Sequence, residues 1–118
     1  MDKQTQVENA NRNSDRFLTA FHRIEQAMKD IIGAKDHLSF FRLIELSKRK
    51  NATIRRFEND LREFSTLRNA IVHQRTSTEY AIAEPHDEIV ESIEAIEQEL
   101  TKPIMVREMF ARKINTIK

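Results

Sequence analysis

The sequence is poor in the residues that make turns and covalent cross-links. Its 118 residues include one glycine, two prolines and no cysteine. So few turn residues argue against a hairpin-rich β fold and favour long helices. A chain without cysteine has no disulfide, no thiol nucleophile and no zinc–thiolate site.

Long apolar runs are also missing. No stretch approaches the ~20 apolar residues that cross a bilayer, and the N-terminus has no apolar signal segment. We therefore expect a cytoplasmic protein without a membrane partner. The length suits one domain, and 39% apolar with 33% charged residues is typical of a globular chain.

Charge is distributed unevenly along the chain. Residues 1–78 carry 15 basic and 10 acidic side chains, residues 79–100 carry none and 8, and residues 101–118 carry five and one. Two interpretations are open. The acidic part is a solvated helix between basic ones, or the basic part is a surface for an anion and the acidic helix faces away.

Amphipathic periodicity predicts four main helices, over about 14–32, 39–50, 52–74 and 85–102. Ser14 is the expected N-cap of the first helix and Gly33 its C-cap, while Asn51 caps the third and Pro85 starts the fourth. We predict an all-α, up-and-down four-helix bundle over residues 14–102. A polar tail, 1–13, precedes it, and 103–118 form an extra short C-terminal helix or the lead-in to a missing module.

An arginine interrupts the apolar seam of the third predicted helix. The seam recurs at steps of three or four through Ile54, Phe57, Leu61, Phe64 and Ile71. Arg68 lies about 20° from Phe57 on the same helical wheel, near the middle of the stripe. Because an unpaired buried charge is costly, either Arg68 has a partner inside the bundle or the bundle opens there.

A polar strip runs along the same helix. Asn69 and His73 are four residues apart and stack on one face, and Arg62 lies on that face too. Asn69 and His73 could share a cleft with Arg68 at the end of the bundle. Alternatively, His73 is an exposed histidine favoured by the helix dipole, Arg68 reaches a surface carboxylate, and Arg62 is solvated.

The stretch LRNAIVH, residues 67–73, is similar to the arginine-x4-histidine signature of the HEPN superfamily, with Asn69 as the polar residue after the arginine. HEPN domains are all-α bundles that carry this signature near the end of the third main helix. The stretch FHRIEQAMKDII, which contains Glu25, resembles the first helix of the family. Residues 80–103 resemble a branch in which the bundle precedes a pair of CBS modules. The resemblance covers about residues 14–105.

The resemblance implies a chemistry. Many HEPN proteins are metal-independent endoribonucleases that act as homodimers, with the motifs of both subunits in one site. His73 would be the acid or base, since an unperturbed histidine pKa of about 6.5 suits either role. Arg68 would fork onto phosphoryl oxygens, and Asn69 would orient His73 or donate to phosphate. No cofactor is implied, and the four histidines show no metal-ligand spacing.

Three further residues are candidates for substrate binding, each with a plainer alternative. Glu25 would hold Arg68 when no phosphate is bound, or is an ordinary exposed glutamate. Tyr80 would stack on an RNA base, or packs. Arg62 would bind backbone phosphate. The resemblance allows a partner antitoxin, but Arg75 stands where some toxin members of the family carry the tyrosine that the antitoxin modifies, so that mode of control is in doubt.

Two other functions compete with the nuclease. The acids between 87 and 99 are similar to those of all-α, magnesium-dependent nucleotide pyrophosphatases, but those enzymes need acids on two converging helices and here they crowd one helix. We interpret them as a solvated face. The second alternative is a non-catalytic HEPN module for RNA binding or dimerisation, coupled to a CBS-type regulatory module. An RNase assay on the wild type and on His73→Ala separates enzyme from module.

Overall fold

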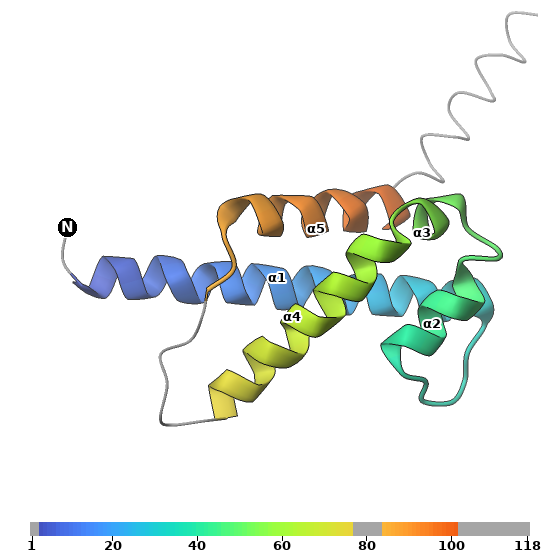
Figure 1. The fold of residues 1–118 in the computed structure, drawn as a ribbon, viewed down its shortest axis with the longest axis horizontal. Coiled ribbons are helices and arrows are strands. Elements are labelled where there is room, and N and C mark those ends of the chain that lie inside the picture. The colour runs from blue at the N-terminus through green and yellow to red at the C-terminus, as the bar shows by residue number, and fades with distance from the viewer. Residues whose placement is uncertain (1–2, 77–83, 102–118) are drawn as a thin grey trace, which may run out of the picture.

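A computed structural model describes residues 3–76 and 84–101, with the backbone alone for 3–12, 75 and 76. Figure 1 shows its five helices, which are α1 (Lys3–Ile32), α2 (Phe40–Ser47), α3 (Ala52–Arg56), α4 (Glu58–Thr76) and α5 (Asp87–Thr101). The described ranges contain no strand. The prediction of an all-α fold is therefore confirmed. The predicted helix over 103–118 lies outside the described residues.

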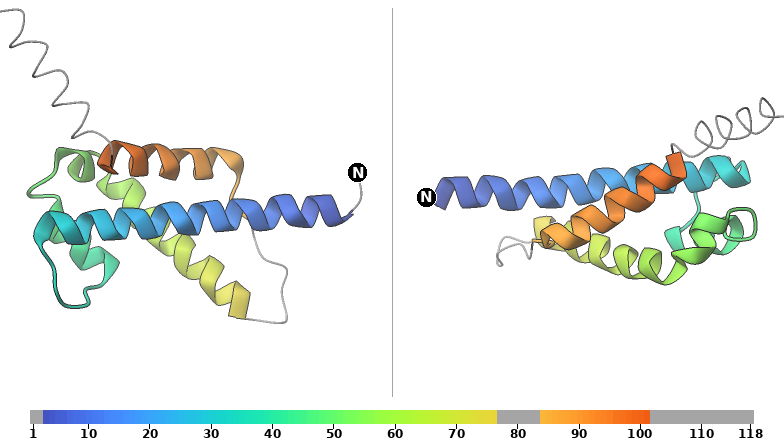
Figure 2. Two further views of the ribbon diagram at one scale, coloured as in Figure 1. Left: turned by 180° about the vertical axis from the view of Figure 1, so that it is seen from behind. Right: turned by 90° about the horizontal axis from the view of Figure 1, so that it is seen from above.

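Helix α1 is the longest helix of the described chain, and α5 lies along it (Figures 1 and 2). The two run in the same direction, because the side chain of Asn13 reaches Asp87 and that of Arg23, further along α1, reaches Glu97. In an up-and-down bundle the first and last helices would be antiparallel. The predicted up-and-down order is therefore not the one that the structure has. Helix α4 crosses α1 obliquely, and α2 and α3 lie at the far end of α1 (Figure 1).

The third predicted helix is two helices, α3 and α4. The break is at Phe57, whose backbone leaves the helical region at φ −103° and ψ 20°. Hydrogen bonds continue across it, because the Phe57 N–H donates to Thr53 at 3.0 Å and the Leu61 N–H donates to Phe57 at 2.9 Å. The apolar period also runs through the break, so the sequence pattern does not reveal it.

Local capping signals were predicted more accurately than the helix order. Gly33 has φ +64°, and the N–H groups of Gly33 and Ala34 donate to Asp30 and Lys29 at 3.3 and 3.0 Å. These two bonds form a Schellman C-cap, which confirms the predicted end of the first helix. The Asn51 side chain accepts from the Ile54 N–H at 3.0 Å and caps α3 as predicted.

Two predicted helix starts differ from the structure. Helix α1 begins at Lys3, so Ser14 is not an N-cap. It lies inside the helix, fully buried, and its hydroxyl donates to Glu84. Polar residues 3–13 have no apolar stripe to predict a helix, so the extension was missed. Helix α5 begins at Asp87, two residues after Pro85.

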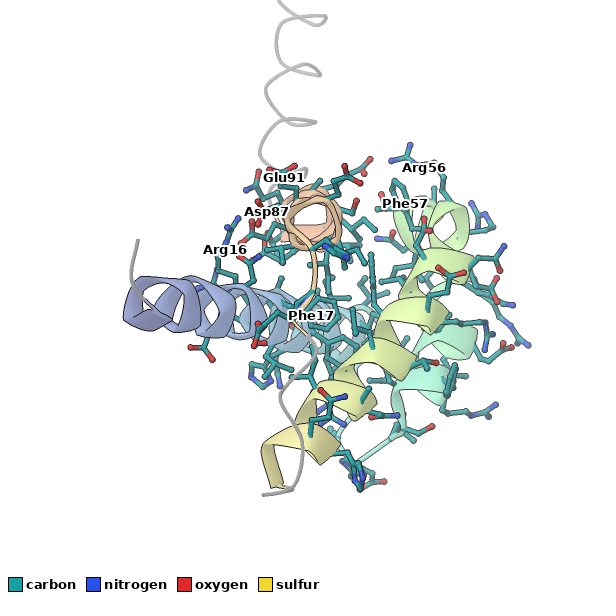
Figure 3. All side chains as sticks on the ribbon, turned by 60° about the vertical axis from the view of Figure 1, so that its left-hand side comes forward. Arg16, Phe17, Arg56, Phe57, Asp87 and Glu91 are labelled. Carbon is teal, nitrogen blue, oxygen red and sulfur yellow. The ribbon has the colours of Figure 1, made fainter. Side chains whose placement is uncertain are left out.

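The core lies between α1, α2, α4 and α5. The ring of Phe17 stacks on Phe21 with centroids 6.3 Å apart and meets the ring of Phe64 edge-on at 5.9 Å. Figure 3 shows Phe17 pointing into the space that α1, α4 and α5 enclose. Among the described residues, no helix is long and apolar enough to cross a membrane.

Candidate functional site

Arg68 lies where the apolar seam of α4 meets solvent. Leu61, Phe64 and Ile71 on the same seam are buried, whereas Arg68 is exposed. It lines a pocket of about 300 Å³ between α1, the start of α2, and α4. The lining residues are Phe21, Glu25, His37, Leu38, Ser39, Phe40, Phe41, Ser65, Arg68 and Asn69. Of the two alternatives for Arg68, the structure has the second, in which the bundle opens.

Two neighbours orient the guanidinium of Arg68. It lies over the ring of Phe21, 5.7 Å from the centroid, a contact worth about 0.5–1 kcal/mol at an exposed site. One terminal N–H group donates to the side-chain oxygen of Asn69 at 3.0 Å. A guanidinium has five N–H donors, so this arrangement fixes its plane and leaves most donors available to an anion in the pocket.

Glu25 lines the same pocket but does not pair with Arg68. Among the described residues, no carboxylate lies within 4.0 Å of the Arg68 guanidinium. The carboxylate of Glu25 instead lies 3.8 Å from Nδ1 of His22, one turn earlier on α1. The expected Glu25–Arg68 pair is therefore not formed, although both charges border one cavity.

His73 lies beyond the pocket. Asn69 is part of the lining, and His73 is exposed one helical turn further along α4, outside the set of residues that line the cavity. One turn is about 5.4 Å of rise. The structure thus brings Arg68 and Asn69 together with Glu25, and places His73 next to that group rather than within it.

The side chain of Arg62 is paired with two carboxylates. Its guanidinium donates to Glu58 at 2.8 Å and also to Glu45 of α2, and it lies 5.5 Å from the ring centroid of Phe41. The hydrogen bond with Glu58 raises the pKa of Arg62, and the hydrogen bonds from Arg62 and Lys48 lower the pKa of Glu58. In this structure Arg62 ties α4 to α2 through Glu45.

The acidic helix is also more engaged than the sequence suggested. Arg16 of α1 holds Glu94 through two hydrogen bonds, at 2.5 and 3.1 Å, and Arg23 holds Glu97 at 3.2 Å. Among the described residues, no group of three or more histidines and carboxylates is placed to hold a metal ion. Several of the acids on α5 are therefore pairing groups for α1, not a purely solvated face.

Sequence reasoning missed three polar residues of the pocket. His37 comes from the turn before α2, Ser39 is the N-cap of α2 and accepts from the Arg42 N–H at 3.2 Å, and Ser65 is a buried hydroxyl on α4. A serine just before an apolar helical stretch is a residue type favoured at an N-cap, but the sequence does not show that this turn folds against α4. Tyr80, another predicted binding residue, lies outside the described residues.

Comparisons with known proteins identify no relative of this chain: no family model, no curated protein and no solved structure matches it.

Proposed function

We propose that this protein is a metal-independent endoribonuclease of the HEPN type, which cuts RNA through attack of a 2′-hydroxyl at a site shared by two copies of the chain. The observation that carries the proposal is the placement of Arg68. An arginine stands exposed on an otherwise apolar seam, oriented by Phe21 and Asn69, at the edge of a pocket. The stretch 67–73 supplies the resemblance that turns this placement into a nuclease hypothesis.

In the proposed reaction the 2′-oxygen forms a bond to phosphorus while the bond from phosphorus to the 5′-oxygen breaks. A base takes the proton of the 2′-hydroxyl, and an acid gives a proton to the leaving 5′-oxygen. The products are a 2′,3′-cyclic phosphate and a 5′-hydroxyl. Arg68 stabilises the charge that builds on the two non-bridging oxygens, Asn69 positions the phosphate, and His73 moves the protons.

The position of His73 favours a homodimer. In one chain Arg68 lines the pocket and His73 does not. In a homodimer, His73 of the second copy would supply the acid–base group to this pocket. Val72, next to His73, is one of the exposed large apolar residues of the described chain, at 39%. An isologous contact between the ends of two α4 helices would bury both Val72 side chains and bring the two motifs together.

Single-turnover cleavage of a single-stranded RNA tests the mechanism. Arg68→Ala should slow it roughly 100-fold or more, because a lost donor of this kind costs about 2.7–4 kcal/mol. Arg68→Lys should not restore the rate, since an ammonium cannot fork onto two oxygens. Arg49→Ala removes the same charge from an exposed turn residue and serves as the control. Activity that requires added magnesium, or that survives both Arg68→Ala and His73→Ala, would contradict the proposal.

Mixing two inactive variants tests the shared site. A dimer of one Arg68→Ala chain and one His73→Ala chain keeps an intact Arg68 on one copy and an intact His73 on the other. If the site is composite, the mixture should recover part of the wild-type rate. No recovery, or a monomer by sedimentation at tens of micromolar, would argue against it.

The alternative is a non-catalytic HEPN module that binds RNA or dimerises. One observation favours it: His73, the proposed acid–base residue, is not part of the pocket that holds Arg68. Binding of RNA that depends on Arg68, with no cleavage by the wild type, would select this alternative.

A further inference from the structure

A second hollow lies on the opposite flank of α4 from the Arg68 pocket. It is a groove of about 610 Å³ between α4 and α5. Its floor is apolar and consists of Phe57, Phe64, Leu67, Ile89, Ala95 and Ile96. Figure 3 looks along α5 and places Phe57 on the α3–α4 side of it, away from Arg16 of α1. The groove is independent of the proposed nuclease site, although Leu67 and Arg68 are neighbours in sequence.

The rim of this groove is negatively charged. Asp60 and Glu63 of α4 and Glu99 of α5 line it. Glu99 is paired with Arg56, the last residue of α3, which Figure 3 shows beside Phe57. Within residues 3–76 and 84–101, Asp60 and Glu63 have no ion-pair partner. An apolar floor between uncompensated carboxylates fits an amphipathic segment that carries basic residues.

The chain itself contains such a segment. Residues 102–118 have five basic residues and one acidic residue. Val106, Phe110, Ile114 and Ile117 recur at steps of four and three, which is the spacing of one helix face. Pro103, just after the last residue of α5, favours a change of direction.

The lengths also match. On α5 the lining residues run from Ile89 to Glu99, ten residues or about 15 Å along the axis. A helix with an apolar face from Val106 to Ile117 covers about 16 Å. Because Glu99 is two residues from the end of α5, a segment that reversed direction after Pro103 would enter the groove from its nearer end.

We propose that residues 104–117 of the same chain dock in the α4–α5 groove. Their apolar face covers Leu67 and Ala95, and their basic side chains compensate Asp60 and Glu63 along the rim. Docking would brace α4 from the flank opposite Arg68. The segment would therefore control how firmly the helix that carries the proposed site is held.

Disulfide trapping in the full chain tests this proposal. Because the chain has no native cysteine, only the introduced pair can form a disulfide. Ala95→Cys places one thiol in the groove, and Gln98→Cys places a matched thiol on α5 at an exposed residue outside the groove. Each is combined in turn with Val106→Cys, Met109→Cys or Lys113→Cys, so that one partner falls near residue 95 whatever the register. A disulfide needs Cα atoms within about 7 Å.

Docking predicts that at least one partner cross-links to residue 95 about ten times faster or more than the same partner cross-links to residue 98. The product should be a monomer on a non-reducing gel. Equal rates at residues 95 and 98 for all three partners would overturn the proposal. A disulfide-linked dimer as the main product would also overturn it, and would assign the groove to a second copy of the chain.

A charge placed on the apolar face gives an independent check. Phe110→Asp should abolish the preference for residue 95, and circular dichroism of the same variant checks that the helical fold is retained. A preference that survives Phe110→Asp would mean that the cross-link does not report apolar docking.

Discussion

The two sides of the molecule are built differently. Along the contact between α1 and α5, charged and polar pairs repeat above a closed apolar core: Asn13 with Asp87 at 2.8 Å, Arg16 with Glu94, and Arg23 with Glu97. Helix α4 has hollows on both flanks, the pocket of about 300 Å³ at Arg68 and the groove of about 610 Å³ toward α5.

The two sides of the molecule therefore have different roles: one holds the helices in alignment, and the other carries the candidate site. The pairs between α1 and α5 hold the two helices in the observed alignment, in which Arg16 meets Glu94 and Arg23 meets Glu97. Helix α4 carries Arg68, Asn69 and His73 where fewer side chains surround them. Regions with fewer buried contacts open more easily, and candidate binding groups are found on this less enclosed side.

The largest expected effect of a substitution is at the closed side. Phe17 is fully buried against Phe21 and Phe64, so Phe17→Ala should lower the free energy of unfolding by about 3–5 kcal/mol. Leu67→Ala, at a half-buried position beside the groove, should cost clearly less, because part of that side chain is already in water. Urea denaturation measures both. Equal losses would mean that α4 is as tightly packed as α1.

A smaller effect is expected from one hydroxyl. Ser14 is fully buried and donates to Glu84, so Ser14→Ala should destabilise the protein by about 1–3 kcal/mol through loss of a hydrogen bond to a charged group. The matched control is Thr66→Ala on α4, where the hydroxyl is exposed and its bond to Arg62 is long, at 3.4 Å. That change should stay within about 0.5 kcal/mol. Equal losses in the free energy of unfolding for Ser14→Ala and Thr66→Ala would contradict this prediction.

Acid should weaken the pairs between helices. The hydrogen bonds from Arg16 lower the pKa of Glu94 below its ordinary value of 4.5. The unfolded chain therefore binds a proton before the folded one does, so this stabilisation is present above about pH 4.5 and is lost as pH falls through the folded pKa. Glu94→Gln should flatten the acid limb of a melting-temperature profile between about pH 3 and pH 7.

Glu58→Gln extends the acid experiment to α4. The pKa of Glu58 is lowered by Arg62 and Lys48, so its substitution should flatten the same limb. Gln26→Glu, which adds a carboxylate at an exposed residue of α1, is the control and should leave the limb unchanged. An acid limb that neither Glu94→Gln nor Glu58→Gln alters would assign the acid sensitivity to other carboxylates.

The smallest effect on stability is expected at the candidate site itself. Arg68 is exposed and contributes a contact with Phe21 and a bond to Asn69. Arg68→Ala should change the free energy of unfolding by no more than about 0.5–1 kcal/mol, while it removes the proposed cleavage. A loss of several kcal/mol would make Arg68 a structural residue and would explain an inactive variant without any role in chemistry.

The sequence predicts the parts of this fold that are decided within a few residues. Gly33 and Asn51 each lie where backbone groups no more than about a turn away are satisfied, so their residue types alone mark helix ends. The alignment of α5 with α1 depends on partners more than 70 residues apart. A pattern of apolar residues is the same for a parallel and an antiparallel neighbour, so the direction of α5 was missed.

The candidate site, like the fold, was predictable only where it depends on residues close together in the sequence. The position of Arg68 on an apolar seam is a local fact, and it indicated that the bundle either pairs this charge or opens around it. Which carboxylate meets which arginine depends on the helix that lies opposite. Glu45 of α2 pairs with Arg62 because the turn through His37 brings α2 against α4, whereas Glu25 lies beside His22 of its own helix. Helical wheels of single helices contain no such information.

The parallel pairing of α1 and α5 has a consequence for how the chain folds. Its hydrogen bonds join residues 74 to 78 positions apart, which raises the contact order and slows folding relative to a bundle of sequential hairpins. At synthesis rates of about 5–20 residues per second, the side of α1 that pairs with α5 is without its partner for roughly 4–16 s on the ribosome. During that interval the apolar residues buried along α1, such as Phe17 and Ile24, lack part of the cover that they have in the folded chain, so α1 gains from protection against aggregation while the protein is synthesised.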